Sequence, residues 1–289
     1  KEAARKTGLK EGTPVAGGAF DIDACAVAVG GTDEEHVCMI AGTWSINEYI
    51  GRDPITDGSV MMNSFFCLPG YYLVEECSPT SAGNNEWFIK TLLPELKEEC
   101  KKKGTGIYEQ MNDWAEEIPV KEFCPVYLPF LMAGNVHPNA SGSFVGISNF
   151  HTRKHLLRSV YEGVAFSHRY HLERLLRTKR GPVRSIRLAG GAARSPVWAQ
   201  MFADVMKLPI EIVQVNETGA FGCALIGAAA SGAYEDIAGA AAAMCKISEP
   251  IHPDMERAAI YDKKYELYRK TIEALDGLWD TIQKYKDGI

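Results

Sequence analysis

The spacing of hydrophobic residues divides the chain into a strand-rich first part and a helix-rich remainder. Residues 22–29 are small and apolar, which predicts a tightly packed helix that ends at the Gly30-Gly31 pair. The Gly42-Thr43 pair separates two of the apolar runs that follow and predicts a hairpin between them. These runs are short, as is typical of strands, and lie at 36–41, 44–50 and 71–75.

Further along the chain, apolar residues recur every three or four positions, which is the period of a helix with one buried face. This period predicts helices over 84–101, 152–179, 196–206 and 220–231. Short apolar runs between the later helices predict strands at 186–189 and 210–213. Strands that are followed by alternating strands and helices are typical of an α/β fold with a mixed sheet. No internal repeat or long linker interrupts the pattern, so we expect one domain over 14–289.

The two ends of the chain carry different patterns. Residues 1–13 are charged and contain glycine, which predicts a linker or the end of a helix. Lys1 is not an initiator Met, and we expect the chain to be a piece of a longer protein. Near the C-terminus, an apolar stripe with steps of four and three predicts a helix face that packs on the core rather than a ligand site. The stripe consists of Tyr261, Tyr265, Tyr268, Ile272, Leu275, Trp279 and Ile282.

Composition and charge narrow the class of protein. The 31 basic and 37 acidic residues give a formal net charge of −6, and no basic patch is visible, which argues against nucleic-acid binding. No apolar run reaches the roughly 18 residues of a membrane span. The eight cysteines are irregularly spaced without a Cys-x-x-Cys pair. We therefore expect reduced, mostly buried cysteines, no metal-ligating set and a cytoplasmic protein.

Several common catalytic motifs are missing. The chain contains no Walker-type phosphate loop, no Gly-x-Gly-x-x-Gly before a helix, no His-Glu-x-x-His and no Gly-x-Ser-x-Gly. An NAD-dependent dehydrogenase is disfavoured, because the Gly190-Gly191 pair lacks the third spaced glycine of that fingerprint.

Two glycine-containing bends are candidates for ligand contacts. Gly42-Thr43 can present backbone N–H groups and a hydroxyl to an anion, although taken alone the pair is more often a plain β-turn. Gly190-Gly191 follows a predicted strand and precedes a helix whose start is marked by Ser195 and Pro196. These glycines would let a flat ligand approach the backbone beside a helix N-terminus, or would simply make a tight connection.

Asp21 is the candidate for acid–base chemistry. It follows Gly17-Gly18 and precedes the small-residue helix, so its carboxylate is either a helix N-cap or a base that accepts a proton from a substrate hydroxyl. Asp23 lies two residues further and would point to another side of the helix.

Taken together and in order, these segments resemble the FGGY family of carbohydrate kinases. The span 142–162 fits the family's long C-terminal signature, and 15–21 resembles its glycine-rich segment that ends in the catalytic Asp. The bends at 42–43 and 188–196 resemble its phosphate-side and adenosine-side segments, and 217–224 resembles the helix that follows. The resemblance covers only the C-terminal half of the family, and it implies one lobe of the actin-like, ribonuclease H-like ATPase fold. The N-terminal lobe, which would supply most sugar contacts and the acidic residue nearest Mg²⁺, is absent.

The resemblance also implies roles for individual residues. Asp21 would be the general base toward the sugar hydroxyl, and Gly42 and Thr43 would contact the phosphates of ATP, which is bound with Mg²⁺. The residues implied to contact the rest of the nucleotide are Gly83, Glu86, Gly190, Gly191 and Ser195.

Two stretches depart from the common family pattern. Trp44 follows Gly42-Thr43 where members often have Ser, and the stretch 44–49 resembles the L-xylulose kinase branch most. Residues 134–138 replace the Gly-Glu-Arg-x-Pro of many members, so no role is assigned to that loop. The resemblance thus implies the C-terminal lobe of an ATP-dependent kinase for a small sugar. The expected substrate is a ketopentose such as L-xylulose. Its expected partners are the sugar, its own N-terminal lobe and a second copy in a homodimer. The alternative is a non-catalytic lobe that binds a nucleotide or a partner.

Overall fold

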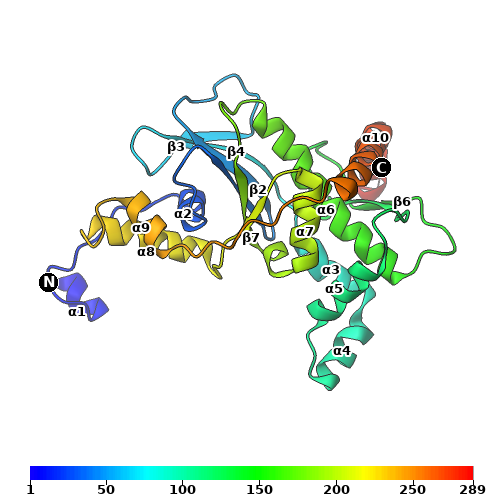
Figure 1. The fold of residues 1–289 in the computed structure, drawn as a ribbon, viewed down its shortest axis with the longest axis horizontal. Coiled ribbons are helices and arrows are strands. Elements are labelled where there is room, and N and C mark those ends of the chain that lie inside the picture. The colour runs from blue at the N-terminus through cyan, green and yellow to red at the C-terminus, as the bar shows by residue number, and fades with distance from the viewer. Residues whose placement is uncertain (289) are drawn as a thin grey trace.

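A computed structural model describes residues 1–288; position 289, the last of the expected 14–289 domain, lies outside the described residues. A six-stranded sheet in the order β3-β4-β2-β1-β7-β8 forms its centre (Figure 1). β1 pairs with β7 in parallel, as does β7 with β8, and the other neighbours are antiparallel. The strands are β1 (His36–Ala41), β2 (Ser45–Gly51), β3 (Met62–Phe65), β4 (Tyr72–Ser78), β7 (Ser185–Gly190) and β8 (Ile210–Ile212), with a separate pair β5 (Val126–Leu128) and β6 (Ser143–Val145).

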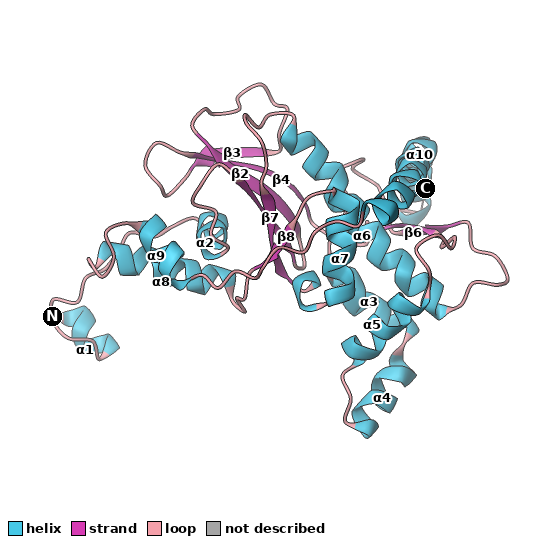
Figure 2. Ribbon diagram, in the orientation of Figure 1, coloured by secondary structure: helices cyan, strands magenta, loops and turns pink. Residues whose placement is uncertain are grey.

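Helices cover both faces of this sheet (Figure 2). One face carries α2 (Asp21–Ala28), α8 (Thr218–Ala230) and α9 (Ile237–Met244). The other face carries α3 (Gly83–Leu92), α5 (Ile107–Glu117), α6 (Arg153–Leu176), α7 (Pro196–Met206) and α10 (Met255–Lys286). Two further helices are α1 (Glu2–Thr7) and α4 (Pro94–Lys103), and a 3₁₀ turn spans Ala192–Arg194. The expected mixed sheet with flanking helices is therefore confirmed.

Alternation along the strands separates the two cores. On β2, Tyr49 belongs to the core under α6, and the next residue, Ile50, belongs to the core under α2. On β4, Val74 and Leu73 divide in the same way. Successive side chains of a strand point to opposite faces, and both faces of these strands are buried.

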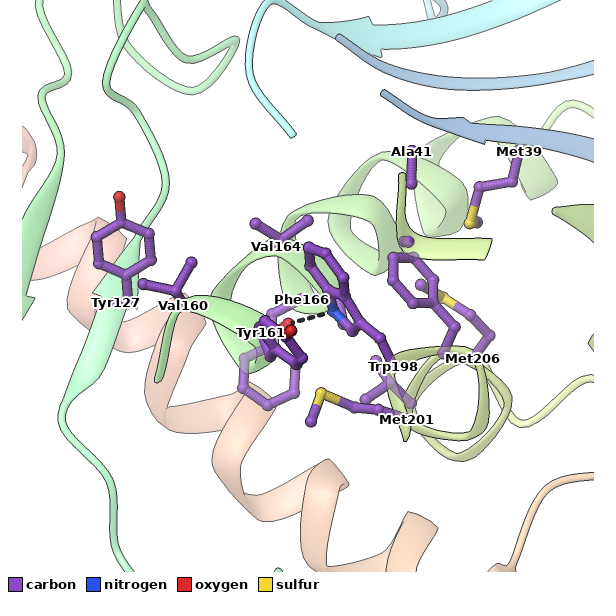
Figure 3. Close-up of a cluster of buried hydrophobic side chains, with 14 of the residues drawn as sticks. Met39, Ala41, Tyr127, Val160, Tyr161, Val164, Phe166, Trp198, Met201 and Met206 are labelled. Carbon is purple, nitrogen blue, oxygen red and sulfur yellow. Dashed lines mark hydrogen bonds between the residues drawn. The ribbon is translucent and has the colours of Figure 1, made fainter. Parts of the chain in front are cut away.

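Helix α6 is the central element of the larger core. Figure 3 shows its side chains packed between α7 and the strand β1. Tyr161 stacks on Trp198, with ring centroids 4.3 Å apart, and the Trp198 indole donates to the Tyr161 backbone oxygen at 3.0 Å. A Cβ on Gly163 would lie 2.3 Å from the Tyr127 carbonyl oxygen, so only glycine allows α6 to lie this close to β5.

Small residues bring α2 and α8 equally close on the opposite face. A Cβ at Gly222 of α8 would lie 1.8 Å from the Ala24 carbonyl oxygen of α2. This contact confirms the prediction that the small-residue helix packs tightly. The structure begins it at Asp21 rather than Ile22, and Phe20, not Asp21, occupies the N-cap position.

The predicted helices and strands are found with ends that differ by up to three residues, except for one predicted helix that is wrong. The segment 84–101 is not one helix, because the chain turns at Leu93 and restarts as α4 with Pro94 in its first turn, where a proline needs no N–H partner. The aromatic stripe of α10 packs on the core as expected. Only half of the cysteines are buried rather than most: Cys38, Cys77, Cys100 and Cys124 are buried, three are partly exposed, and Cys223 is exposed.

Among residues 1–288, no helix combines the length and the apolar character that a membrane crossing needs.

Three carboxylates lie buried between the sheet and α2. Glu48 of β2 is fully buried and directly opposite Glu75 of β4, and Asp23 of α2 is buried near them. Neither Glu48 oxygen has a hydrogen-bond partner among the described residues. Burial, followed by the neighbouring Glu75 and Asp23, raises the pKa of Glu48 well above its usual value. Burial likewise raises the pKa of Asp23 to about 6.

The change Glu48→Gln should therefore stabilise the fold in a pH-dependent way. The pKa of Glu48 is higher in the folded than in the unfolded protein, where it is about 4.3. Its protonated form therefore contributes fully to the stability of the fold only below about pH 4.3, and that contribution is lost as the pH rises through the pKa of the folded state. Gln does not titrate, so the gain in Tm should be small near pH 5 and reach a few degrees near pH 8. Differential scanning calorimetry at both pH values measures it. The exposed Glu98 of α4 supplies the control Glu98→Gln, and an equal change at both pH values for Glu48→Gln would contradict the prediction.

Candidate functional site

A cleft of about 790 Å³ lies where the parallel strands β1 and β7 end. Ala41 and Gly190 are partners in the last register pair, so the residues that follow, Gly42 and Gly191, meet at one edge of the sheet. Ligands of open α/β sheets bind at such carboxyl ends of strands. The cleft is lined by all seven residues that the sequence predicts for nucleotide contacts: Gly42, Thr43, Gly83, Glu86, Gly190, Gly191 and Ser195.

Gly190 shows why this edge needs glycine. Its φ is +92°, which L side chains rarely adopt, and a Cβ would lie 2.6 Å from the Ala41 carbonyl oxygen and 3.0 Å from the Gly42 nitrogen. A side chain here would force the ends of β1 and β7 apart. The bend after β7 is thus held against the bend after β1.

The bend at Gly42-Thr43 is joined to the start of α3. Ser81 donates its backbone N–H to the Thr43 oxygen at 2.9 Å, and Gly83 donates to the Gly42 oxygen at 3.3 Å. Gly83 is the first residue of α3, and a helix N-terminus carries a partial positive charge, while the N–H groups of Gly83, Asn84 and Asn85 are donated within the protein. This side of the cleft is suited to an anion.

The opposite side carries the helix cap Ser195 and the buried aromatic pair Tyr161 and Trp198. Ser195 caps α7 by accepting from the Trp198 N–H at 3.1 Å, and its hydroxyl donates to the Asn112 side-chain oxygen at 2.6 Å. Tyr161, which stacks on Trp198, also lines the cleft and donates to Asn112 at 3.5 Å. The sequence predicted the Ser195 cap but missed Asn112 and Tyr161 as lining residues.

Charge in the cleft is mixed. Among the described lining residues the cation is Arg194, which donates to Asn216 at 3.4 Å, and the acids are Glu86 and Glu217. Burial, together with Glu86, raises the pKa of Tyr108, and Arg194 opposes that shift.

Asp21 lies outside this cleft lining, on the neighbouring helix α2. It is the first residue of α2, is exposed, and accepts from the Ile22 N–H at 3.0 Å. The thiol of Cys25, one turn along α2, lies 3.2 Å from the hydroxyl of Thr218, which does line the cleft. Asp23 is buried on another side of α2, as expected. Asp21 is therefore free to meet a substrate from solvent, and its catalytic role remains a prediction.

The described residues contain no cluster of three or more His, Cys, Asp or Glu side chains that could hold a metal ion. Mg²⁺ usually keeps several waters and binds substrate phosphates with one or two carboxylates.

Comparison with known proteins gives consistent relatives. The chain is 36% identical over 98% of its length to the L-xylulose/3-keto-L-gulonate kinase of Escherichia coli, and 34% identical over 96% to a probable L-xylulose kinase of Haemophilus influenzae. It covers 55% and 54% of those proteins, so it spans about half the length of the relatives it matches.

Solved structures agree on the fold. The crystal structure of xylulose kinase from Rhodospirillum rubrum superposes with a TM-score of 0.82 at 30% identity, over 96% of this chain and 55% of that one. A ligand-bound xylulose kinase from Lactobacillus acidophilus gives 0.83 at 23% identity, over 97% of this chain and 56% of that one, which supports the fold alone. The mixed sheet with its flanking helices is the actin-like ATPase fold of sugar kinases.

Residues 37–231 match the model of the C-terminal domain of the FGGY family of carbohydrate kinases. This match covers more than half of the chain and agrees with the kinase relatives in fold and in length. The chain therefore belongs to the FGGY family of carbohydrate kinases, as its C-terminal domain.

Proposed function

We propose that this chain is the nucleotide-binding lobe of an ATP-dependent sugar kinase. The observation that carries the proposal is the convergence of Gly42, Gly83, Gly190 and Ser195, from separate parts of the chain, on one cleft. In this proposal the adenosine lies between Gly190-Gly191 and the Ser195 cap. The phosphates lie at Gly42-Thr43 and the N-terminus of α3, with Mg²⁺ neutralising part of their charge.

Asp21 would act as the general base. It takes the proton of the sugar hydroxyl while the hydroxyl oxygen forms a bond to the γ-phosphorus, and the bond between that phosphorus and the bridging oxygen breaks to release ADP. Phosphoryl transfer depends mainly on positioning and charge stabilisation, and a base contributes about 10²–10⁴-fold. The exposed position of Asp21 at the start of α2 supports this role.

The proposed substrate is a small ketopentose such as L-xylulose. Three relatives above 30% identity carry L-xylulose kinase names, and the 44–49 stretch of this chain resembles that branch. The name of the Escherichia coli relative also includes 3-keto-L-gulonate, so sugar acids belong in the same substrate screen.

The proposed partner is an N-terminal lobe of the same protein. Val15, Phe20 and Trp44 are apolar side chains that are 92%, 50% and 49% exposed, and a second lobe would cover such surface. Closing two lobes over the cleft would exclude water and suppress ATP hydrolysis. The homodimer and the cytoplasmic location stay predictions.

The change Gly190→Ala should weaken ATP binding at least about tenfold, because the added methyl group collides with the end of β1. Gly181→Ala is the matched control, since its φ is +80° but nothing lies within 4 Å of the added Cβ. Isothermal titration calorimetry measures the ATP affinities. A thermal melt measures the loss of stability that both variants share because alanine replaces a glycine with a positive φ. Equal ATP affinities for the two variants would argue against a nucleotide at this bend.

The change Asp21→Asn, made in the two-lobe protein, should lower kcat by about 10²–10⁴-fold because the proton acceptor is lost. The KM for ATP should stay within about threefold, since Asp21 does not line the cleft. A coupled ADP-release assay measures both. Asp23→Asn is the comparison variant, and an unchanged kcat for Asp21→Asn would remove Asp21 from the role of general base.

This chain by itself should bind ATP weakly and phosphorylate no sugar, because it supplies one wall of the proposed closed site. Assays of ADP release with ketopentoses, polyols and aldonates test this. Robust phosphorylation by the purified chain would show that the chain contains the complete active site.

A further inference from the structure

A fully buried polar cluster lies behind the phosphate side of the cleft. We call it the His168 cluster; its members are His168 of α6, Ser45 and Asn47 of β2, and Ser81 of the loop before α3, all with no exposed surface. The His168 Nδ1 atom lies 2.9 Å from the Asn47 Oδ1 and 3.1 Å from the Ser45 Oγ, and Nε2 lies 2.8 Å from the Ser81 Oγ.

The hydrogen bonds define one tautomer of the ring. Asn47 donates its amide N–H to the Glu76 backbone oxygen at 3.1 Å, which turns its Oδ1 toward His168. That oxygen can only accept, so His168 Nδ1 carries the proton, and the unprotonated Nε2 accepts from the Ser81 hydroxyl. Burial, with a smaller contribution from His171, lowers the pKa of His168 to about 3, so the ring stays neutral.

The two serine partners of the ring lie close in sequence to residues that line the cleft. Ser45 comes two residues after Thr43, and Ser81 comes two residues before Gly83. The Ser81 N–H also donates to the Thr43 oxygen at 2.9 Å. Any movement of Ser45 or Ser81 away from the ring would therefore shift a residue that lines the cleft.

Helix α6 reaches both ends of the cleft from behind. Tyr161 lines the side with the Ser195 cap, and His168 follows seven residues later on the same helix face, about 10 Å along the axis. His168 also packs edge-on against Phe202 of α7, with ring centroids 5.3 Å apart. One rigid helix thus holds the ring side through Tyr161 and the phosphate side through His168.

We propose that His168 is a positioning residue that holds the Gly42-Thr43 bend and the Ser81-Gly83 loop at the spacing that the nucleotide phosphates require. The inference rests on the proposed nucleotide site and adds a residue that does not itself line the cleft. A buried polar network whose members are all paired fixes one geometry, whereas an apolar core would tolerate small shifts.

The test compares ligands that share the adenosine but differ in phosphates. ATP, ADP and adenosine are titrated, with Mg²⁺, into the wild-type chain and into His168→Leu. This substitution fills the position on α6 with a side chain that has no polar atoms. We expect His168→Leu to weaken ATP binding about tenfold and adenosine binding less than about twofold. Ser81→Ala, which removes the hydroxyl that donates to Nε2, should shift affinity in the same direction.

Rescue and control variants separate positioning from general destabilisation. His168→Gln keeps one donor and one acceptor and should recover most of the ATP affinity. Leu175→Ala, at a fully buried position further along α6, leaves a cavity in the core without reaching the bends, and should leave the ratio of ATP to adenosine affinity unchanged.

The outcomes distinguish this inference from the proposed function. If the wild-type chain binds neither ATP nor adenosine, the nucleotide site itself is wrong and the inference falls with it. If the wild type binds ATP but neither His168→Leu nor Ser81→Ala changes the ratio, or if Leu175→Ala changes it equally, the positioning role is overturned while the nucleotide site stands.

Discussion

The close approach of α6 to the sheet and to β5 is the constraint on which the rest of the structure depends. Gly163 removes the side chain that would separate α6 from the Tyr127 carbonyl group. At this distance Tyr161 can stack on Trp198 at the start of α7. His168 can reach Ser45 at the start of β2 and Ser81 in the loop before α3. One helix that is buried over most of its length thereby sets the relative positions of several cleft-forming segments.

The opposite face of the sheet follows the same principle with different residues. Ala24 and Gly222 bring α2 and α8 into backbone contact, and Cys25 meets Thr218 at the rim of the cleft. The carboxylates of Glu48 and Glu75 lie under this helix pair at an electrostatic cost, which falls when they are protonated. The candidate base Asp21 thus starts a helix with a tightly fixed position above an acidic layer.

Local pattern predicted most elements but not β3, α5 and α9, although α5 buries Met111 and Ala115 at helical spacing. β3 reads Met-Asn-Ser-Phe and is a partly exposed edge strand, so alternation is absent, and α9 is apolar on every side. Local backbone rules singled out Gly42-Thr43, Gly190-Gly191 and the Ser195 cap, whereas Gly83 and Glu86 were implied only by the family resemblance. Asn112 and Tyr161 could not be predicted, since their place in the cleft depends on how α5 and α6 pack. His168 likewise gains its partners only through the fold.

The exposed apolar side chains near the N-terminal end have a practical consequence for handling this chain. Val15 and Phe20 extend into water ahead of α2, and Trp44 does so at the hairpin of β1 and β2. Water drives such surface together regardless of biological fit. Oligomers of the purified chain at high concentration would thus reflect association through this exposed apolar surface, which the proposed second lobe would cover.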